Sequence, residues 1–279
     1  MSLRIATVNV NGIRAAARKG MADWVAERTP DVLTMQEVRA SLDQAQPLIP
    51  SHWHVTLDES NQKGRAGVAV LTRNAPVDVR RELGDDAVDS AGRWLEVDVQ
   101  HGEHVVTVVS CYTHSGEADT PKQQAKWGFL EAQAERMREL AAERDFVVVT
   151  GDFNIGHTEL DIKNWKGNVK RAGFLPRERG YLSRMFGATG EDVTGVDGSV
   201  CAGHGYVDVG RTFAGEVPGP YTWWSNRGQA FDNDSGWRID YQAATPKLAA
   251  TVENYAVDRA AAYDQRWSDH APVVVDYAI

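Results

Sequence analysis

The chain has 279 residues, of which 42% are apolar and 25% charged, and this composition excludes a disordered protein because it can form a sizeable core. Thirty basic against 39 acidic residues give a formal net charge of −9, which excludes a protein that coats nucleic acid non-specifically. A polyanionic partner would therefore need a local basic face or a metal ion.

Strand-like and helix-like segments alternate over the first 150 residues. β-branched or alternating apolar runs predict strands at residues 3–10, 31–36, 67–72, 94–99, 105–112 and 146–150. Helical spacing predicts helices at residues 14–28 and 121–143. In the second helix Trp127, Leu130, Ala134, Met137 and Leu140 recur every three or four residues, which predicts its buried face.

After residue 172 the periodic patterns weaken. Gly, Asp and aromatic residues dominate until strand-like runs return at residues 221–224, 237–245 and 271–279. No Pro/Ser-rich linker or low-complexity block divides the chain, so we expect one domain over residues 1–279. Two sets of long strands, each accompanied by helices, predict an α/β fold: a four-layer sandwich of two packed mixed β-sheets flanked by helices.

Polar side chains stand where several of the predicted strands end. They are Asn9 and Asn11, Gln36 and Glu37, Tyr112, Asp152 and Asn154, Asp240, and Asp269 with His270. In layered α/β folds ligands bind at strand ends, so these groups are predicted to converge on one pocket.

Each of these residues also has a structural explanation when taken alone. Asn or Asp after a strand commonly forms an Asx turn. Tyr112 could be a core residue with a satisfied hydroxyl group, and Asp240 could pair with an arginine. The functional interpretation depends on the number of strand ends that carry such a residue.

The residue types favour one class of chemistry. Carboxylates and amides without cysteine suit a hard cation such as Mg²⁺, whereas zinc would call for more His or Cys ligands. An Asp that orients a histidine, a tyrosine hydroxyl and an Asp-x-Asn pair could activate water and stabilise the charge that grows on phosphorus. The pattern predicts hydrolysis of a phosphodiester.

Seven motifs occur in a fixed order over nearly the whole chain. They are N-V-N-G-I-R-A (9–15), P-D-V-L-T-M-Q-E (30–37), G-D-F-N-I-G-H (151–157), D-I-K-N-W-K-G-N (161–168), A-G-F-L-P-R-E-R (172–179), G-W-R-I-D-Y (236–241) and S-D-H-A-P (268–272). In this ordered set the sequence resembles the exonuclease III and apurinic/apyrimidinic (AP) endonuclease family of the endonuclease/exonuclease/phosphatase superfamily.

The resemblance implies a four-layer sandwich of the deoxyribonuclease I type. It also implies Mg²⁺-dependent cleavage of the DNA backbone 5′ to abasic sites, with 3′-to-5′ exonuclease and 3′-end trimming activity, and with Mn²⁺ as an alternative cofactor. The expected partner is double-stranded DNA that carries abasic sites or 3′ ends, and the expected state is a monomer.

The resemblance further implies a metal site. Glu37 would be the main ligand, with Asn9, Asn11 and Asp269 near the ion.

The same resemblance implies the catalytic residues. Asp152 would activate or orient the attacking water, and Asn154 would hold that water or the transition-state oxygen. Tyr112 and His270 would contact the scissile phosphate, while Asp240 would fix the tautomer and charge of His270.

A third set of residues would bind DNA by the same resemblance. It consists of Arg14, Lys163, Asn164, Lys166, Asn168, Trp223, Trp237, Arg238 and Ile239. Residues 161–168 would lie along the DNA, and Trp223, Trp237 and Ile239 would wall a pocket for a flipped abasic sugar. For Trp224 we expect a place in the core.

The sequence departs from the family pattern at three places. Y-T-H-S-G follows Tyr112 where Y-x-P is common, Trp223 stands where Phe is common, and residues 225–235 form a polar stretch. These departures leave open the balance between abasic-site cleavage and exonuclease action, and they give His114 no role.

Two alternative functions stay open. One is a phosphatase or phosphodiesterase that acts on a non-DNA phosphate ester, which would lack the paired motifs at 161–168 and 236–241. The other is a catalytically inactive DNA-binding homologue, which would not keep every catalytic side chain.

The location is predicted from what the sequence does not contain. No apolar run has the length needed to span a bilayer, and the first residues lack a signal-peptide pattern. Cys111 and Cys201 are far apart and have no zinc-ligand spacing. We expect a soluble, cytoplasmic protein without membrane contact.

Overall fold

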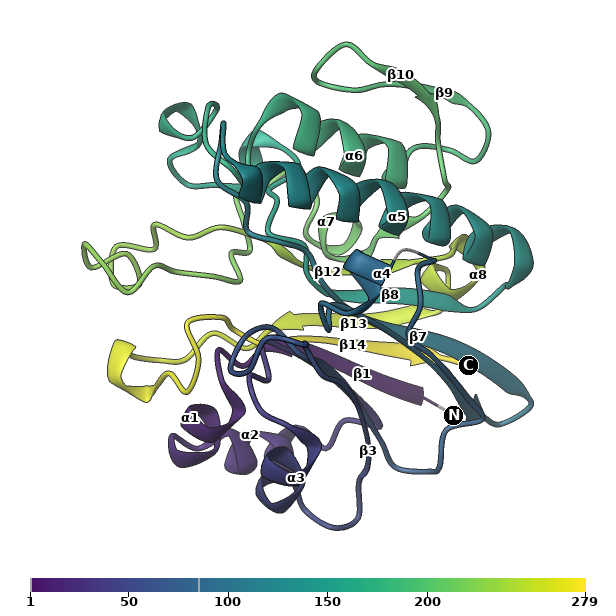
Figure 1. Cartoon of the computed structure of the whole chain (residues 1–279), viewed down its shortest axis with the longest axis vertical. Helices are drawn as coiled ribbons and strands as arrows, with labels where there is room; N and C mark the ends of the chain where they lie inside the picture. The colour runs from purple at the N-terminus through teal and green to yellow at the C-terminus, as the bar shows by residue number, and fades with distance from the viewer. Residues whose placement is uncertain (1, 85) are drawn as a thin grey trace.

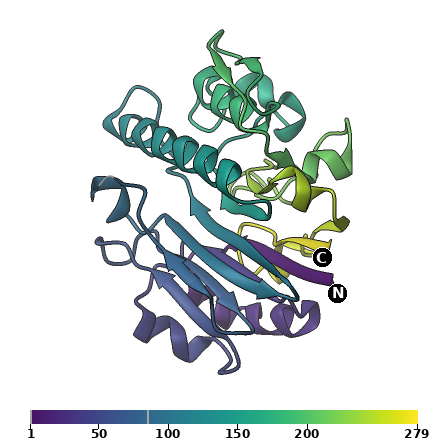
Figure 2. The same cartoon turned by 90° about the vertical axis from the view of Figure 1, so that its right-hand side faces the viewer.

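Two six-stranded sheets lie face to face between two outer layers of helices (Figures 1 and 2). The structure is a computed structural model that describes residues 2–84 and 86–279. The predicted four-layer α/β sandwich is confirmed. The prediction of a single domain over residues 1–279 stays a prediction.

The first sheet contains the N- and C-terminal strands. Its order is β13 (Val252–Val257), β14 (Val273–Ala278), β1 (Ser2–Asn9), β2 (Val32–Gln36), β4 (Val68–Thr72) and β3 (His54–Asp58). The second sheet has the order β11 (Val207–Asp208), β12 (Asp240–Ala244), β8 (Val147–Asp152), β7 (His104–Tyr112), β6 (Trp94–His101) and β5 (Asp78–Arg80). A separate hairpin joins β9 (Asp192–Thr194) to β10 (Val200–Ala202).

Each large sheet has one parallel pair at its centre. β1 runs parallel to β2, with Asn9 opposite Gln36, and β7 runs parallel to β8, with Tyr112 opposite Asp152. All other pairs in the two sheets are antiparallel, and β12 places Asp240 opposite Asp152. Polar side chains at the carboxyl ends of the central strands are thereby held on rigid backbone.

The space between the sheets is apolar along most of its length and polar near the carboxyl ends of the central strands. Val70, Leu95 and Val108 belong to the apolar part. Nearer those ends, the hydroxyl groups of Thr34 and Thr150 lie 2.6 Å apart across the interface. Each buried hydroxyl therefore has a partner, and the two sheets are joined by a specific contact as well as by apolar packing.

Helices cover the outer face of each sheet. α1 (Ile13–Arg18), α2 (Met21–Arg28) and α3 (Leu42–Ala45) pack on the first sheet, and α5 (Pro121–Glu143) and α6 (Pro176–Phe186) pack on the second. The remaining helices are α4 (Asp86–Asp89), α7 (Val209–Ala214), α8 (Pro246–Ala249) and the 3₁₀ turns Gln46–Leu48, Glu159–Asp161, Trp165–Gly167 and Tyr263–Gln265. None of the described helices is long and apolar enough to cross a membrane.

The helix predicted over residues 14–28 is in fact two helices. Gly20 adopts φ 105°, a conformation that residues with a side chain rarely adopt, and it separates α1 from α2. The prediction over 121–143 is confirmed by α5, where Thr120 caps the first turn and Pro121 occupies the first helical position. Its buried face, however, includes Lys126, while Trp127 is only partly buried.

The helix α6 was not predicted, because the periodic patterns are weak after residue 172. Its buried face contains Glu178, Arg179 and Gly180 beside Leu182 and Met185, so the apolar period is broken. The strand predicted at residues 221–224 is wrong, because Trp223 makes only isolated bridges to Trp237 and His270. Both cysteines are free.

Candidate active site

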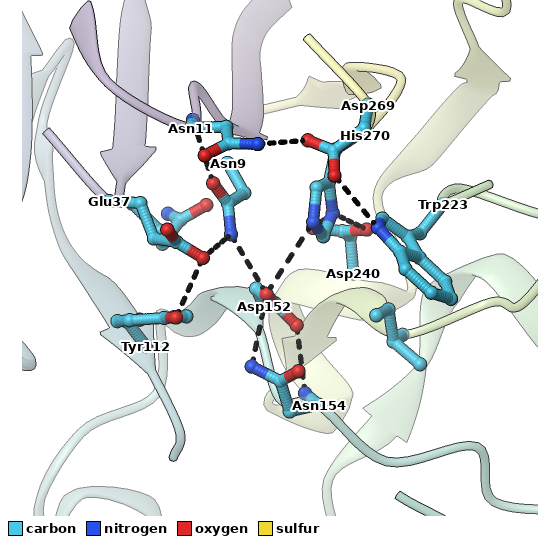
Figure 3. A network of polar contacts seen from close by, with 12 residues as sticks. Asn9, Asn11, Glu37, Tyr112, Asp152, Asn154, Trp223, Asp240, Asp269 and His270 are labelled. Carbon is cyan, nitrogen blue, oxygen red and sulfur yellow. Dashed lines mark hydrogen bonds and ion pairs between the residues drawn. The ribbon is translucent and has the colours of Figure 1, made fainter. Parts of the chain in front are cut away.

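Two similar turns lie at the carboxyl ends of β1 and β8. The backbone N–H of Asn11 donates to Asn9 Oδ1 at 2.9 Å, and that of Asn154 donates to Asp152 Oδ1 at 2.8 Å. Asn11, Asn154 and Glu37 have positive φ values of 45°, 50° and 51°. The Asx turns expected from local sequence therefore exist, and the same turns bring the side chains to one place (Figure 3).

Asn9 joins the two sheets at this edge. Its Nδ2 donates to Glu37 Oε1 at 3.0 Å and to Asp152 Oδ2 at 2.9 Å. Asn9 is fully buried, and its hydrogen bond to Asp152 is shielded from water, whereas the bond to Glu37 is partly buried. Figure 3 shows that these contacts belong to one continuous network across the site.

Glu37 accepts from a phenol on the opposite sheet. Tyr112 Oη donates to Glu37 Oε1 at 2.6 Å, and Arg39 pairs with the other carboxylate oxygen. Burial and then the Glu37 charge raise the pKa of Tyr112 well above its usual range, so the phenol stays protonated. The Arg93 guanidinium stacks 4.5 Å from the Tyr112 ring centre and donates to the Tyr112 carbonyl at 3.1 Å.

Asp152 lies at the centre of the site and is 1% exposed. Burial raises its pKa to about 7, with a further contribution from the Asp240 charge, and against opposition from the His270 charge and the Asn9 hydrogen bond. Asn154 Nδ2 donates to Asp152 Oδ2 at 3.1 Å and to a backbone carbonyl, that of Thr113, at 2.9 Å. A carboxylate with a pKa near neutrality is suited to accept a proton at physiological pH.

His270 lies between two carboxylates. Its Nδ1 is 2.9 Å from Asp240 Oδ2, which can only accept when ionised, so Nδ1 carries a hydrogen. Nε2 is 3.8 Å from Asp152 Oδ2. Burial opposes a charged imidazole, but Asp240 and Asp152 outweigh it and raise the pKa of His270 to about 10. The imidazole is therefore a cation at neutral pH.

Asp269 receives one side-chain donor on each oxygen. Asn11 Nδ2 donates to Oδ1 at 2.8 Å, and Trp223 Nε1 donates to Oδ2 at 3.1 Å. Burial would raise the pKa of Asp269, but the His270 charge and the two donors outweigh it and lower the pKa. The carboxylate is thus held ionised and in a fixed orientation.

These groups open onto a cavity of about 450 Å³. Trp223, Trp237 and Ile239 form apolar walls, and Ala172 and Gly173 line the cavity beside them. Gly173 has φ 92°, and a Cβ at this position would lie 2.7 Å from the Trp237 ring, so only glycine fits there. The cavity combines a polar floor with walls that suit the apolar face of a small cyclic group.

One group of side chains with metal-ligand composition is Asp152, Asp240 and His270, whose ligand atoms all lie within 4.8 Å of one another. In this group the imidazole Nδ1 is already paired with Asp240 Oδ2 at 2.9 Å, and Nε2 faces Asp152 Oδ2 at 3.8 Å. An imidazole held between two carboxylates is arranged to hold or move a proton. The geometry therefore favours proton chemistry for this group.

The second group is the predicted one. Glu37, Asn11 and Asp269 line the cavity, while Asn9 is buried behind them and orients Glu37. Carboxylate and amide oxygens without sulfur are the donors that a hard divalent cation prefers. This group fits a hard divalent cation better than the His270 group does.

The predicted DNA-binding residues differ in their surroundings: Trp223, Trp237 and Ile239 line the cavity, Arg238 is buried, and the others lie at or near the surface. Arg14, Lys163, Asn164 and Lys166 are exposed, and Asn168 is partly buried and bonded to the Asn164 carbonyl.

The prediction for Arg238 is wrong. The side chain is 1% exposed and forms ion pairs with Asp161 and Asp208, each at 2.7 Å, so it cannot reach a phosphate. Asp161 is equally buried, and within the predicted DNA-binding segment it acts as part of this ion-pair cluster. Trp224 lies in the core, as expected.

A basic cavity of about 470 Å³ adjoins the site through Arg39. Arg14, Lys63 and Arg65 also line it. These side chains form a positively charged flank on a protein whose net charge is −9.

Sequence reasoning missed a buried ion pair beside the site. Lys126 Nζ lies 2.7 Å from Glu178 Oε1, with both side chains 0% exposed, and it also donates to the carbonyls of Asn154 at 3.0 Å and Ser115 at 3.3 Å. Glu178 accepts from the Gly173 N–H at 2.7 Å. The pair therefore fixes three backbone segments around the cavity. The available signal was a lysine at a buried position of the α5 period.

Comparison with known proteins gives consistent matches. The endonuclease/exonuclease/phosphatase family matches residues 6–270. An exodeoxyribonuclease of Bacillus subtilis is 30% identical over 97% of this chain and 98% of its own length. A DNA-(apurinic or apyrimidinic site) endonuclease of Dictyostelium discoideum is 29% identical over 98% of this chain and 71% of its own. The structure of a 3′-5′ exonuclease from Neisseria meningitidis superposes with a TM-score of 0.82 at 28% identity, and the match covers 99% of this chain and 100% of the other.

Proposed function

The chain belongs to the endonuclease/exonuclease/phosphatase family, and from this membership we propose that it is a DNA repair phosphodiesterase that cleaves the backbone 5′ to abasic sites. The proposal includes 3′-to-5′ exonuclease and 3′-end trimming activity. The observation that carries it is the network of hydrogen bonds and one ion pair that gathers Glu37, Asp152 and His270 at one apolar-walled cavity.

Asp152 is the proposed base. Its pKa of about 7 gives a substantial ionised fraction at neutral pH together with enough basicity to accept a proton from water. Asn154 is fixed by the Thr113 carbonyl and by Asp152, and it would hold the attacking water or a phosphate oxygen. A water that contacts both Asp152 and Asn154 would be positioned to attack the phosphorus in line with the bond that breaks.

His270 and Tyr112 are the proposed donors to the phosphate. Because 3.8 Å exceeds a hydrogen bond, His270 Nε2–H is free to donate to a phosphate oxygen, while Asp240 holds Nδ1–H. Tyr112 is kept protonated, and its single O–H, which donates to Glu37 Oε1, would become the second donor by turning to a phosphate oxygen when a cation engages Glu37. Donors fixed before the reaction stabilise the charge that develops on the phosphate.

A divalent cation, which we propose to be Mg²⁺ with Mn²⁺ as a substitute, would be held by Glu37, Asp269 and Asn11, with Asn9 orienting Glu37. When bound, such a cation neutralises negative charge on phosphate oxygens. Arg39 pairs with Glu37 and offsets part of its negative charge.

The proposed substrate is double-stranded DNA. Trp223, Trp237 and Ile239 would enclose a flipped abasic sugar, because the apolar walls favour a sugar without its base. The exposed Arg14, Lys163 and Lys166 would contact phosphates on the flanks.

The test is an incision assay on end-labelled duplexes. One duplex carries a single abasic analogue, one is intact and one is nicked, and an inositol phosphate is offered in parallel. We expect a Mg²⁺-dependent cut 5′ to the abasic analogue that a chelator abolishes, with slower removal of nucleotides from the nick. Binding of the duplex without any cut would favour an inactive homologue, and phosphate release from the inositol phosphate alone would favour the non-DNA alternative.

A further inference from the structure

Trp223 contacts both the candidate cation site and the candidate sugar pocket. We propose that Trp223 is a positioning residue whose indole N–H holds the Asp269 carboxylate for the cation while its ring walls the cavity, so that cation binding and seating of an abasic sugar are coupled. This inference rests on the proposed function and goes further, because it assigns one residue to both events.

The contact between Trp223 and Asp269 is directional. Trp223 Nε1 donates to Asp269 Oδ2 at 3.1 Å, and Asn11 donates to Oδ1 at 2.8 Å (Figure 3). With one donor on each oxygen the carboxylate cannot rotate, and each oxygen keeps lone-pair capacity for a cation. Partners that orient a metal ligand are known to change metal affinity by about 10- to 100-fold.

The backbone of Trp223 is equally constrained. Its N–H and C=O exchange hydrogen bonds with Trp237, both at 2.9 Å, and the neighbouring Trp224 N–H donates to the Asp269 carbonyl at 3.2 Å. The Trp223 and Trp237 rings meet edge to face, with centroids 6.0 Å apart and planes at 89°. A rotation of the Trp223 ring would therefore break its bond to Asp269 and displace the cavity wall together.

Trp237 offers a matched control within the same cavity. It is a wall residue of the same type and size, and it is the edge-to-face partner of Trp223. Among residues 2–84 and 86–279, its indole N–H has no hydrogen-bond partner. Replacing either tryptophan by phenylalanine shortens a wall, but only Trp223→Phe removes a donor from Asp269.

The first experiment measures Mn²⁺ binding to the DNA-free protein by electron paramagnetic resonance. We expect Trp223→Phe to weaken Mn²⁺ binding by roughly tenfold, and Trp237→Phe to leave it within about twofold of the wild type. Equal Mn²⁺ affinity in wild type and Trp223→Phe would overturn the inference, as would equal losses in the two variants.

The second experiment measures the coupling. In an Asp152→Asn background that suppresses cleavage, the affinity for an abasic duplex is measured with and without Mn²⁺. We expect Mn²⁺ to strengthen binding in the background protein and with Trp237→Phe, and to strengthen it much less with Trp223→Phe, because coupling between two sites is reciprocal. An undiminished Mn²⁺ effect in the Trp223→Phe protein would overturn the coupling.

A third measurement uses only the wild-type protein, so it does not depend on whether a variant folds. In ¹⁵N-tryptophan-labelled wild-type protein, the Trp223 Nε1–H signal should shift on addition of Mg²⁺ while the Trp237 signal stays in place. Absence of a Trp223 shift would overturn the inference. A protein that fails to incise abasic DNA but shows the Mn²⁺ and Mg²⁺ effects would support the positioning role and overturn the proposed function alone.

Discussion

The site ends of the two sheets have the same backbone plan and different electrostatics. The first sheet presents Asn9 and Asn11 at the end of β1, and the second presents Asp152 and Asn154 at the end of β8, in each case through an Asx turn beside a parallel neighbour strand. The first adds Glu37, which directly follows β2, and the second adds the Tyr112 phenol at the end of β7.

The difference between the two ends arises from burial and neighbouring charge. Asp269, which lies just before β14 of the first sheet, has a lowered pKa, whereas burial raises the pKa of Asp152 on the second sheet to about 7. Carboxylates that stay charged and line the cavity suit a cation, and a carboxylate with a raised pKa suits proton transfer. A similar pair of turns can therefore serve two kinds of chemistry, and the following variants test that division.

The largest loss of incision rate is expected for variants of the residues proposed to transfer protons or contact the phosphate. Asp152→Asn and His270→Asn should each slow incision by at least about a hundredfold while the protein still folds and binds DNA. Additional Mg²⁺ should not restore the rate, because neither residue is proposed to hold the cation. Single-turnover incision over a Mg²⁺ series measures this, and near-normal activity in either variant would contradict the assignment.

A smaller loss of incision rate, which added Mg²⁺ can reverse, is expected for a variant of the proposed cation ligand Glu37. Glu37→Gln keeps the shape of the side chain and removes its charge, so incision should fall at low Mg²⁺ by at least the roughly 10- to 100-fold that loss of a residue orienting a metal ligand costs. Raising Mg²⁺ should recover much of the loss. If Glu37→Gln responds to Mg²⁺ no more than Asp152→Asn does, the division between the two sheet ends is wrong.

The buried pair Lys126–Glu178 supports only the second-sheet side, so its loss should act there. Lys126→Met leaves the Glu178 charge unpaired, which typically destabilises a protein by about 3–5 kcal/mol. Incision should slow by roughly tenfold through a slight displacement of Asn154, which is less than the loss of about a hundredfold known for a 1 Å misplacement.

Two controls accompany this variant. Lys122→Met removes an exposed lysine, 74% accessible, from the same helix and should change neither the stability nor the rate. Lys126→Arg keeps a positive charge, so it should lose less stability and less incision rate than Lys126→Met. Thermal unfolding and incision at saturating Mg²⁺ measure the effects, and a rate that falls for Lys122→Met as well would show that the loss is unspecific.

Lys163 and Arg238, which were both predicted to bind DNA, should differ in their effect on the salt dependence of DNA binding. Lys163→Ala should lower the slope of log affinity against log salt by about 0.9, as expected for one lost phosphate contact. Arg238→Lys should leave that slope unchanged and lower the stability, because Arg238 is buried between Asp161 and Asp208. Fluorescence anisotropy over a salt series separates the two, and a changed slope in Arg238→Lys would reinstate its predicted DNA contact.

The smallest effect is expected for loss of the hydrogen bond from Asn9 to Asp152, which joins the two sheets. Asn9 donates to Asp152 and lowers its pKa, so Asn9→Ala should raise that pKa. Ionised Asp152 is the proposed base, so incision rises with pH through its pKa, and the acid limb of the pH–rate profile should move upward by less than about one unit. A profile that moves to lower pH would contradict the role of Asn9.

Local sequence was sufficient for most of the central elements. The strands at β1, β2, β4, β6, β7, β8 and β14 and the helix α5 were predicted because their apolar periods or β-branched runs are long. α6 was not predicted, since its buried face carries charged residues whose partners lie far along the chain.

The residue types at the strand ends already carried the chemical information. A set of acids, amides, a phenol and an imidazole following apolar runs was visible in the linear chain, and so was its order. Turn formation at Asn9–Asn11 and Asp152–Asn154 is also a local property, because the side-chain oxygen and the N–H that it accepts are two residues apart.

Folding alone decided which of these groups are partners, because the contacts join residues that are distant in the chain. The pKa of about 7 for Asp152 depends on burial and on Asp240, and the orientation of Asp269 depends on Trp223. Likewise, Arg238 and Lys163 are both cations in motifs that were predicted to bind DNA, and only packing buries the first and exposes the second. Electrostatic character follows from the surroundings in space, which no local pattern of residues contains.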